Sequence, residues 1–142
     1  MIFVIDASVA AKWFLPDEPC SALALELLRS AAMGATDFIV PDLFFPECGN
    51  LLWKAARHQR LSAEETLAAI QLIADLQTLT VPASGLLNRT LQIARTYDRT
   101  FYDSLYIAVA LQHRTHLITA DQKLANATAA YLPVKWLGAL QI

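Results

Sequence analysis

Short apolar runs alternate with longer amphipathic stretches along the whole 142-residue chain. The apolar runs are typical of buried strands, whereas the stretches between them carry apolar residues at three- and four-residue spacing, which is typical of helices. Strands are predicted over residues 2–5, 38–40, 79–81, 117–119 and 134–136. This alternation predicts an α/β fold in one domain over residues 1–142, a three-layer α/β/α sandwich with a central parallel sheet of about five strands.

The predicted helices begin and end at familiar sequence signals. Ser62 and Glu65 form a capping box that starts one helix, and Pro46 is tolerated because it falls in the first turn of another. Helices are predicted over residues 8–14, 18–33, 43–59, 62–76, 84–97, 101–114 and 121–130. Ligands of such sheets bind beyond the carboxyl ends of the strands, so residues that follow the strands are the first candidates for a site.

Four acidic residues occupy such places in the chain: Asp6, Glu47, Asp103 and Asp121. Asp6 and Asp121 each follow a predicted strand, Asp103 opens a predicted helix, and Glu47 lies on the apolar stripe of another. Carboxylates that converge without cationic partners repel one another, and a divalent cation with oxygen ligands relieves that repulsion. The four residues therefore predict a metal site.

Each acidic residue also has a simpler interpretation. Asp6 and Asp121 suit helix N-caps, and Asp103 could pair with Thr100 in a capping box. Glu47 would be largely buried on its stripe and would need a partner. The alternatives for Glu47 are an ion pair with an arginine or lysine, or a shifted stripe that leaves it at the helix edge.

Hydroxyl and basic side chains lie near these carboxylates in the sequence. Ser8 and Thr119 are each two residues from a strand-end aspartate, where a hydroxyl can fix a carboxylate rotamer; local turn or cap bonding is the alternative. Lys12, Lys54 and Arg57 are candidates for contacts with nucleic-acid phosphates, with a solvated helix face as the alternative for the latter two.

Composition narrows the function further. Hydrophobic residues make up 56% of the chain and charged residues 17%, yet no uncharged apolar run is long enough for a membrane span. The N-terminus lacks the basic region of a signal peptide, so a cytoplasmic location is expected, with Cys20 and Cys48 as free buried thiols. The net charge of −2 argues against a broad basic surface for nucleic acid, although metal bound to the four carboxylates would offset it.

Four segments together resemble the signature segments of the PIN-domain nucleases, and more narrowly those of VapC-type toxins of type II toxin–antitoxin pairs. They are Val4-Ile-Asp-Ala-Ser-Val9, Phe45-Pro-Glu-Cys-Gly-Asn50, Phe101-Tyr-Asp-Ser-Leu-Tyr106 and Leu117-Ile-Thr-Ala-Asp121. The resemblance covers the full length of the chain and implies Mg²⁺-dependent cleavage of RNA, with Mn²⁺ able to substitute, a homodimer, and inhibition by a small antitoxin.

The same resemblance implies roles for individual residues. Asp6, Glu47, Asp103 and Asp121 match the acidic quartet of the family as catalytic residues and metal ligands, and Ser8 and Thr119 match its hydroxyl positions. Two departures stand out. Pro46 directly precedes Glu47, and Leu124 stands where some relatives carry a further acidic residue, so a second metal would be held weakly.

Two other functions remain open from the sequence. One is a non-catalytic binding subunit with the same fold, although the intact acidic quartet argues against it. The other is a receiver-type domain with Asp6 or Asp121 as phosphoacceptor. Such a domain needs an acidic pair after its first strand, which is absent, and a lysine after its last strand, whereas Lys135 lies inside the predicted one.

The helices predicted over residues 43–59 and 62–76 carry more apolar residues than one inner face requires: Leu51, Leu52, Trp53, Leu67, Ile70, Leu72 and Ile73. The excess predicts a dimer surface and a groove for an antitoxin helix. Trp53 is the candidate anchor, because buried aromatic residues dominate interface energies. Packing of Trp53 within the monomer core is the alternative.

Overall fold

The computed structural model describes residues 1–142 and contains the predicted sheet of five parallel strands. The strands are β1 (Ile2–Ile5), β2 (Asp37–Pro41), β3 (Thr78–Val81), β4 (His116–Thr119) and β5 (Val134–Trp136), in the order β3-β2-β1-β4-β5. β1 is central, and its Val4 and Ile5 are fully buried. A strand covered on both faces reads as a continuous apolar run, which explains the sequence pattern.

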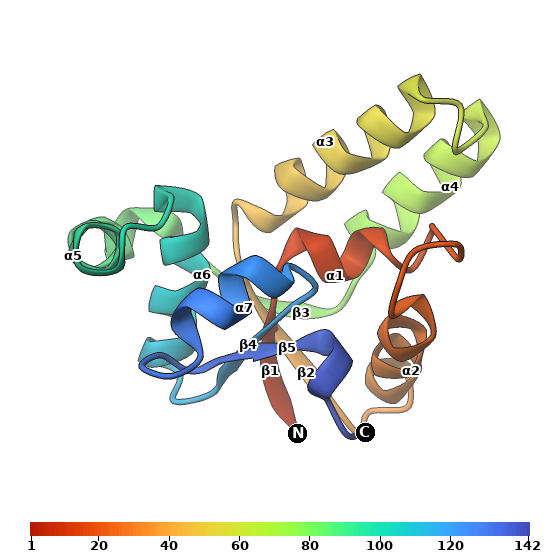
Figure 1. Cartoon of the computed structure of the whole chain (residues 1–142). Coiled ribbons are helices and arrows are strands. Elements are labelled where there is room, and N and C mark those ends of the chain that lie inside the picture. The colour runs from red at the N-terminus through yellow and green to blue at the C-terminus, as the bar shows by residue number, and fades with distance from the viewer.

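Helices cover both faces of the sheet (Figure 1). They are α1 (Ala7–Ala11), α2 (Ser21–Ala32), α3 (Phe44–Arg57), α4 (Ala63–Ala74), α5 (Leu87–Tyr97), α6 (Phe101–Gln112) and α7 (Gln122–Thr128). Right-handed crossovers between parallel strands place α1 to α4 on one face and α5 to α7 on the other. The predicted three-layer sandwich is therefore confirmed. In Figure 1, α3 and α4 lie side by side and project beyond the sheet.

Local signals explain where the helices begin and end. Ser62 and Glu65 form the predicted capping box, with both hydrogen bonds at 3.0 Å. The helix predicted from residue 18 begins instead at Ser21, because Cys20 adopts a left-handed conformation with φ of 63°. α1 ends at Ala11 rather than at residue 14, and Lys12 to Phe14 continue with tighter bonds to the third preceding carbonyl.

The strand order of the sheet reverses between β1 and β4, which are neighbours in the sheet but not in the sequence. β2 and β3 extend the sheet on one side of β1, and β4 and β5 extend it on the other. Ile5 and Ile118 lie opposite each other at the carboxyl ends of β1 and β4. Open α/β sheets bind their ligands at such a switch point, and Asp6 directly follows Ile5 there.

Both cysteines are free thiols, as predicted, with Cys48 buried and Cys20 only partly buried. None of the helices has both the length and the apolar character that crossing a membrane requires.

Candidate functional site

All four acidic residues singled out in the sequence line one open pocket of about 250 Å³, beyond the carboxyl ends of β1 and β4. This acidic pocket is lined by Asp6, Ala7, Ser8, Glu47, Asn50, Leu51, Lys54, Asp103, Tyr106 and Asp121. α3 and α6 each contribute one carboxylate from within the helix, and the other two follow β1 and β4 by one and two residues. The parallel topology thus brings together residues that are up to 115 positions apart in the sequence.

Asp6 caps α1 and also faces the acidic pocket. Its Oδ1 accepts hydrogen bonds from the Ser8 amide at 3.1 Å, from the Val9 amide at 3.3 Å, and from the Ser8 hydroxyl. The residue is only 7% exposed. Burial raises the pKa of Asp6 to about 6, against the opposing effect of the Ser8 hydrogen bond and with a smaller contribution from Asp103. Asp6 therefore caps α1 and still faces the other carboxylates of the acidic pocket, and its hydrogen bonds to the start of α1 fix where its carboxylate points.

Glu47 lies at the edge of the buried stripe of α3. That stripe consists of Phe44, Cys48, Leu52 and Ala55, so the prediction that Glu47 shares the apolar face was wrong by one position. The shift leaves Glu47 half-buried and turned toward the acidic pocket.

Tyr106 is the partner of Glu47, and sequence reasoning missed it. The Tyr106 hydroxyl donates a 2.6 Å hydrogen bond to Glu47 Oε1, and Tyr106 is only 2% exposed. Burial raises the pKa of Glu47, the Tyr106 hydrogen bond opposes that rise, and Asp103 adds to it. Tyr106 lies three residues after Asp103 on α6, a spacing that places both on one helix face, so this signal was present in the sequence.

Asp103 and Asp121 also occupy helix starts. The Asp103 amide donates to Thr100 Oγ1 at 3.0 Å, but the Thr100 amide does not donate to the Asp103 carboxylate in return, so the capping box is incomplete. Burial raises the pKa of Asp103, and repulsion from Asp121 raises it further. Asp121 is exposed and accepts a 3.1 Å bond from the Leu124 amide as the cap of α7.

The two hydroxyl residues connect the carboxyl ends of β1 and β4. Ser8 Oγ donates to Asp6, accepts from the Ala120 amide at 3.0 Å and lies 3.4 Å from Thr119 Oγ1. Thr119 is buried and accepts from the Asp121 amide at 3.1 Å. Ser8 thus orients a carboxylate directly, whereas Thr119 orients the backbone that carries the next one.

The donor set of the acidic pocket fits a divalent cation. None of the four carboxylates forms an ion pair, since all the ion pairs of the chain involve Asp17 or Glu18. The pKa values of Asp6, Glu47 and Asp103 are all raised, which marks the cost of holding these charges without a cation. No group of three or more acidic, histidine or cysteine side chains is already assembled as a metal cluster. A cation held by three or more of these carboxylates would therefore require the side chains to move closer together.

The three basic candidates fall in different places. Lys54 lines the acidic pocket. Lys12 lies in the adjoining depression, where its Nζ is 3.6 Å from Glu18 Oε2. Arg57 lines neither, because its guanidinium lies over the Trp53 ring, 5.9 Å from the centroid.

Comparisons with known proteins agree with this arrangement. The model of the PIN domain family matches residues 3–130. Ribonuclease VapC1 of Mycobacterium tuberculosis is 31% identical over 134 residues, which cover 93% of this chain and 95% of that protein. Ribonuclease VapC3 of Pyrobaculum aerophilum is 29% identical over 89% of this chain and 94% of that protein. The crystal structure of PAE2754 from Pyrobaculum aerophilum superposes with a TM-score of 0.68 at 24% identity, over 97% of this chain and 85% of that one. This last similarity confirms the fold.

Proposed function

The chain belongs to the PIN domain family, and from that premise we propose that it is a Mg²⁺-dependent endoribonuclease, with Mn²⁺ able to substitute, and the toxin of a toxin–antitoxin pair. The convergence of Asp6, Glu47, Asp103 and Asp121 without a cationic partner carries the proposal. Relatives that align along nearly the whole chain are ribonucleases by name, which supports RNA as the substrate.

Each residue of the acidic pocket then has a role in binding or orientation. A bound divalent cation lowers the pKa of water and stabilises the charge that develops on the scissile phosphate. Asp6, Asp103 and Asp121 are the proposed ligands, and Glu47, held by Tyr106, completes the site directly or through water. Ser8 fixes the Asp6 carboxylate. Lys54, the single basic residue that lines the acidic pocket, is placed to attract the phosphate.

A second cation would find few ligands. Leu124 is buried in the core, where some relatives have a further carboxylate, so the α7 side of the pocket offers only Asp121. Mg²⁺ keeps several water ligands when few carboxylates are present. We therefore propose that one cation is held firmly and a second, if it binds, only with the substrate phosphate.

The purified protein is expected to cleave single-stranded RNA only with Mg²⁺ or Mn²⁺, and the same metals should raise its melting temperature. A cation that binds only the folded state stabilises it by about 2.7 kcal/mol at roughly 100 times its Kd, which corresponds to several degrees for a domain of this size. Calorimetric melting and RNA cleavage, each with and without EDTA, measure both effects.

The Asp6→Asn, Asp103→Asn double variant is the control for this metal effect, because it lacks two of the proposed ligands and should melt at one temperature in either buffer. Cleavage that persists in EDTA would contradict the metal requirement. A parent melting curve that is unchanged by millimolar Mn²⁺ would contradict the site.

The projecting hairpin of α3 and α4 is the proposed surface for a second copy and for an antitoxin helix. Leu52 and Ile73 are used in the core, but Trp53, Leu67, Ile70 and Leu72 are exposed. Trp53 is 59% exposed, so its packing within the monomer core, the alternative considered from the sequence, is wrong. Exposed apolar side chains of this size are candidates for burial against a partner.

Replacing Trp53 with alanine is expected to weaken binding of the cognate antitoxin by about 2 kcal/mol or more, roughly 30-fold in Kd, because aromatic anchors dominate interface energies. Titration calorimetry with the antitoxin measures this, and sedimentation at micromolar concentration reports the homodimer. Tyr131→Ala is the matched control, since Tyr131 is a 78% exposed aromatic residue outside the hairpin. Equal binding by both variants would remove Trp53 from the interface, and a monomer would contradict the dimer.

A further inference from the structure

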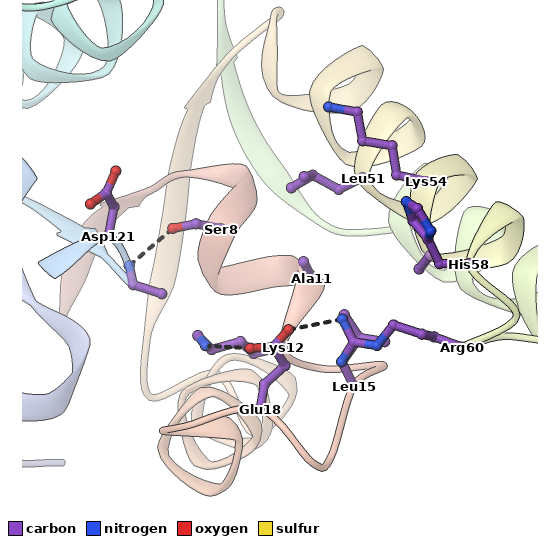
Figure 2. Close-up of a pocket in the computed structure, with 12 residues that line it drawn as sticks. Ser8, Ala11, Lys12, Leu15, Glu18, Leu51, Lys54, His58, Arg60 and Asp121 are labelled. Carbon is purple, nitrogen blue, oxygen red and sulfur yellow. Dashed lines mark hydrogen bonds and ion pairs between the residues drawn. The ribbon is translucent and has the colours of Figure 1, made fainter. Parts of the chain in front are cut away.

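A second depression adjoins the acidic pocket, and basic side chains outnumber the two carboxylates, Glu18 and Asp121, in its lining. This basic groove has a volume of about 330 Å³ and shares Ser8, Leu51, Lys54 and Asp121 with the acidic pocket, so the two form one continuous surface. Its basic side chains are Lys12, Lys54, His58 and Arg60. Figure 2 shows them on both walls of the groove, with Lys12 next to α1 and the other three on or after α3.

Glu18 occupies the middle of the basic groove. Its carboxylate lies 3.6 Å from Lys12 Nζ through one oxygen and 3.0 Å from Arg60 Nη1 through the other, so it joins the two walls (Figure 2). The Lys12 side chain is only 13% exposed and has no other ion-pair partner. Glu18 thus places one anionic group between two cations, which is the arrangement that a phosphate makes with a lysine and an arginine.

We propose that the basic groove binds a phosphate of the RNA strand next to the scissile one, and that Glu18 holds this subsite closed until the RNA phosphate displaces it. The proposal rests on the ribonuclease function proposed above and adds the route that the strand takes from the acidic pocket. Lys54 lines both depressions and lies between the two phosphates, while Lys12 and Arg60 receive the second phosphate when Glu18 swings out. An RNA phosphate fits the basic groove because its lining is mainly basic and because it is continuous with the pocket that receives the scissile phosphate.

Although Lys12 is largely buried, displacement is feasible because Glu18 and Arg60 are 32% and 37% exposed, so the ion pair between them is open to solvent. Such pairs contribute little net stability, since solvent screens them and ordering the side chains has a cost. Glu18 also lies on the segment between α1 and α2, outside any helix or strand, so the carboxylate can move without unfolding an element. A phosphodiester carries one negative charge shared by two non-bridging oxygens, as a carboxylate does, so it can form the same contacts with Lys12 and Arg60 that Glu18 forms.

Replacing Glu18 with glutamine tests the closed subsite. Glu18→Gln should bind a fluorescent single-stranded oligouridylate in EDTA roughly 3- to 10-fold more tightly than the parent, because binding no longer requires two ion pairs to break. Asp17→Asn is the matched control. Asp17 also pairs with Arg60, at 3.2 Å, and its loss changes the net charge equally, but Asp17 does not line the groove. The control should bind like the parent.

A second pair of variants separates this role from a structural one. Lys12→Met should remove most of the gain when it is combined with Glu18→Gln, because the freed lysine is what receives the phosphate. Melting curves of all the variants report folding. Equal affinity of Glu18→Gln and the parent, or an equal gain in Asp17→Asn, would overturn the proposal.

The binding assay and the cleavage assay fail independently. Binding is measured in EDTA, where no cleavage is expected. A tighter complex of Glu18→Gln with the oligouridylate would therefore support the subsite whether or not the protein cleaves RNA. Absence of cleavage with Mg²⁺ or Mn²⁺ would contradict only the proposed nuclease function. A parent that cleaves RNA while Glu18→Gln binds no more tightly would leave the nuclease in place and overturn the closed subsite.

Discussion

Replacing Asp6 with asparagine is expected to reduce metal-dependent RNA cleavage by at least about 100-fold while leaving the chain folded. Removing a residue that only hydrogen-bonds to a metal ligand costs about 10- to 100-fold in metal affinity or activity. Asp6 is proposed as a direct ligand, so its loss should cost at least as much. Asparagine also caps helices well, so α1 should keep its start. Asp121→Asn should have a similar effect, since Asp121 lies opposite Asp6 across the switch point of the sheet.

Asp42→Asn is the matched control for this prediction. Asp42 also follows a strand of the sheet, β2, but it accepts a bond from the Ala83 amide at 3.1 Å and does not line the acidic pocket. Initial rates of cleavage with Mg²⁺ and with Mn²⁺ should fall only in the Asp6 and Asp121 variants. Full activity of Asp6→Asn in either metal would exclude the proposed ligand role.

In the absence of metal, ionisation of Asp6 is expected to lower the free energy of unfolding by about 3 kcal/mol as the pH rises from about 4 to about 7, and Asp6→Asn should remove this part of the fall. The pKa of Asp6 is raised from 3.8 to about 6 in the folded protein, and each pKa unit corresponds to about 1.36 kcal/mol. Between these two values the folded state binds the proton that the unfolded state has released. Raising the pH through this window therefore costs stability.

Glu47 and Asp103 should contribute in the same direction, because their pKa values are also raised. Urea unfolding of the parent, Asp6→Asn and Asp42→Asn in EDTA across this pH range isolates the contribution of Asp6. At neutral pH, Asp6→Asn should be at least as stable as the parent, since it no longer buries an ionised carboxylate. Parallel stability curves for the parent and Asp6→Asn would contradict the raised pKa.

Much of the site follows from the sequence because its residues are fixed by local rules. A carboxylate one or two residues after a buried parallel strand lies at the carboxyl edge of the sheet, and Asp6 and Asp121 obey that rule. Their helix caps obey a second local rule. The two rules reinforce each other, so the positions of the two aspartates could be predicted without knowing the packing of the helices.

The contacts that join distant segments could not be predicted in the same way. Glu18 and Arg60 are 42 residues apart, and their contact depends on the left-handed turn at Cys20, which keeps Glu18 out of α2. Arg57 was expected near the phosphate, but the exposed Trp53 ring one turn earlier attracts it. Packing against α1 and α4 sets the rotation of α3 that places Glu47 at the edge of the buried face of this helix. The spacing of apolar residues within α3 alone does not determine that rotation.

The central position of β1 has a consequence for the chain during its own synthesis. Asp6 is made well before Asp103 and Asp121, yet the strand on one side of β1 is β4, which lies between those two aspartates in the sequence. A nascent chain that ends at β3 carries only Asp6 and Glu47, and it leaves one edge of β1 unpaired. The acidic pocket therefore cannot assemble until β4 and Asp121 have been made, so a ribosome is not exposed to an active nuclease while it is still making the segments before them.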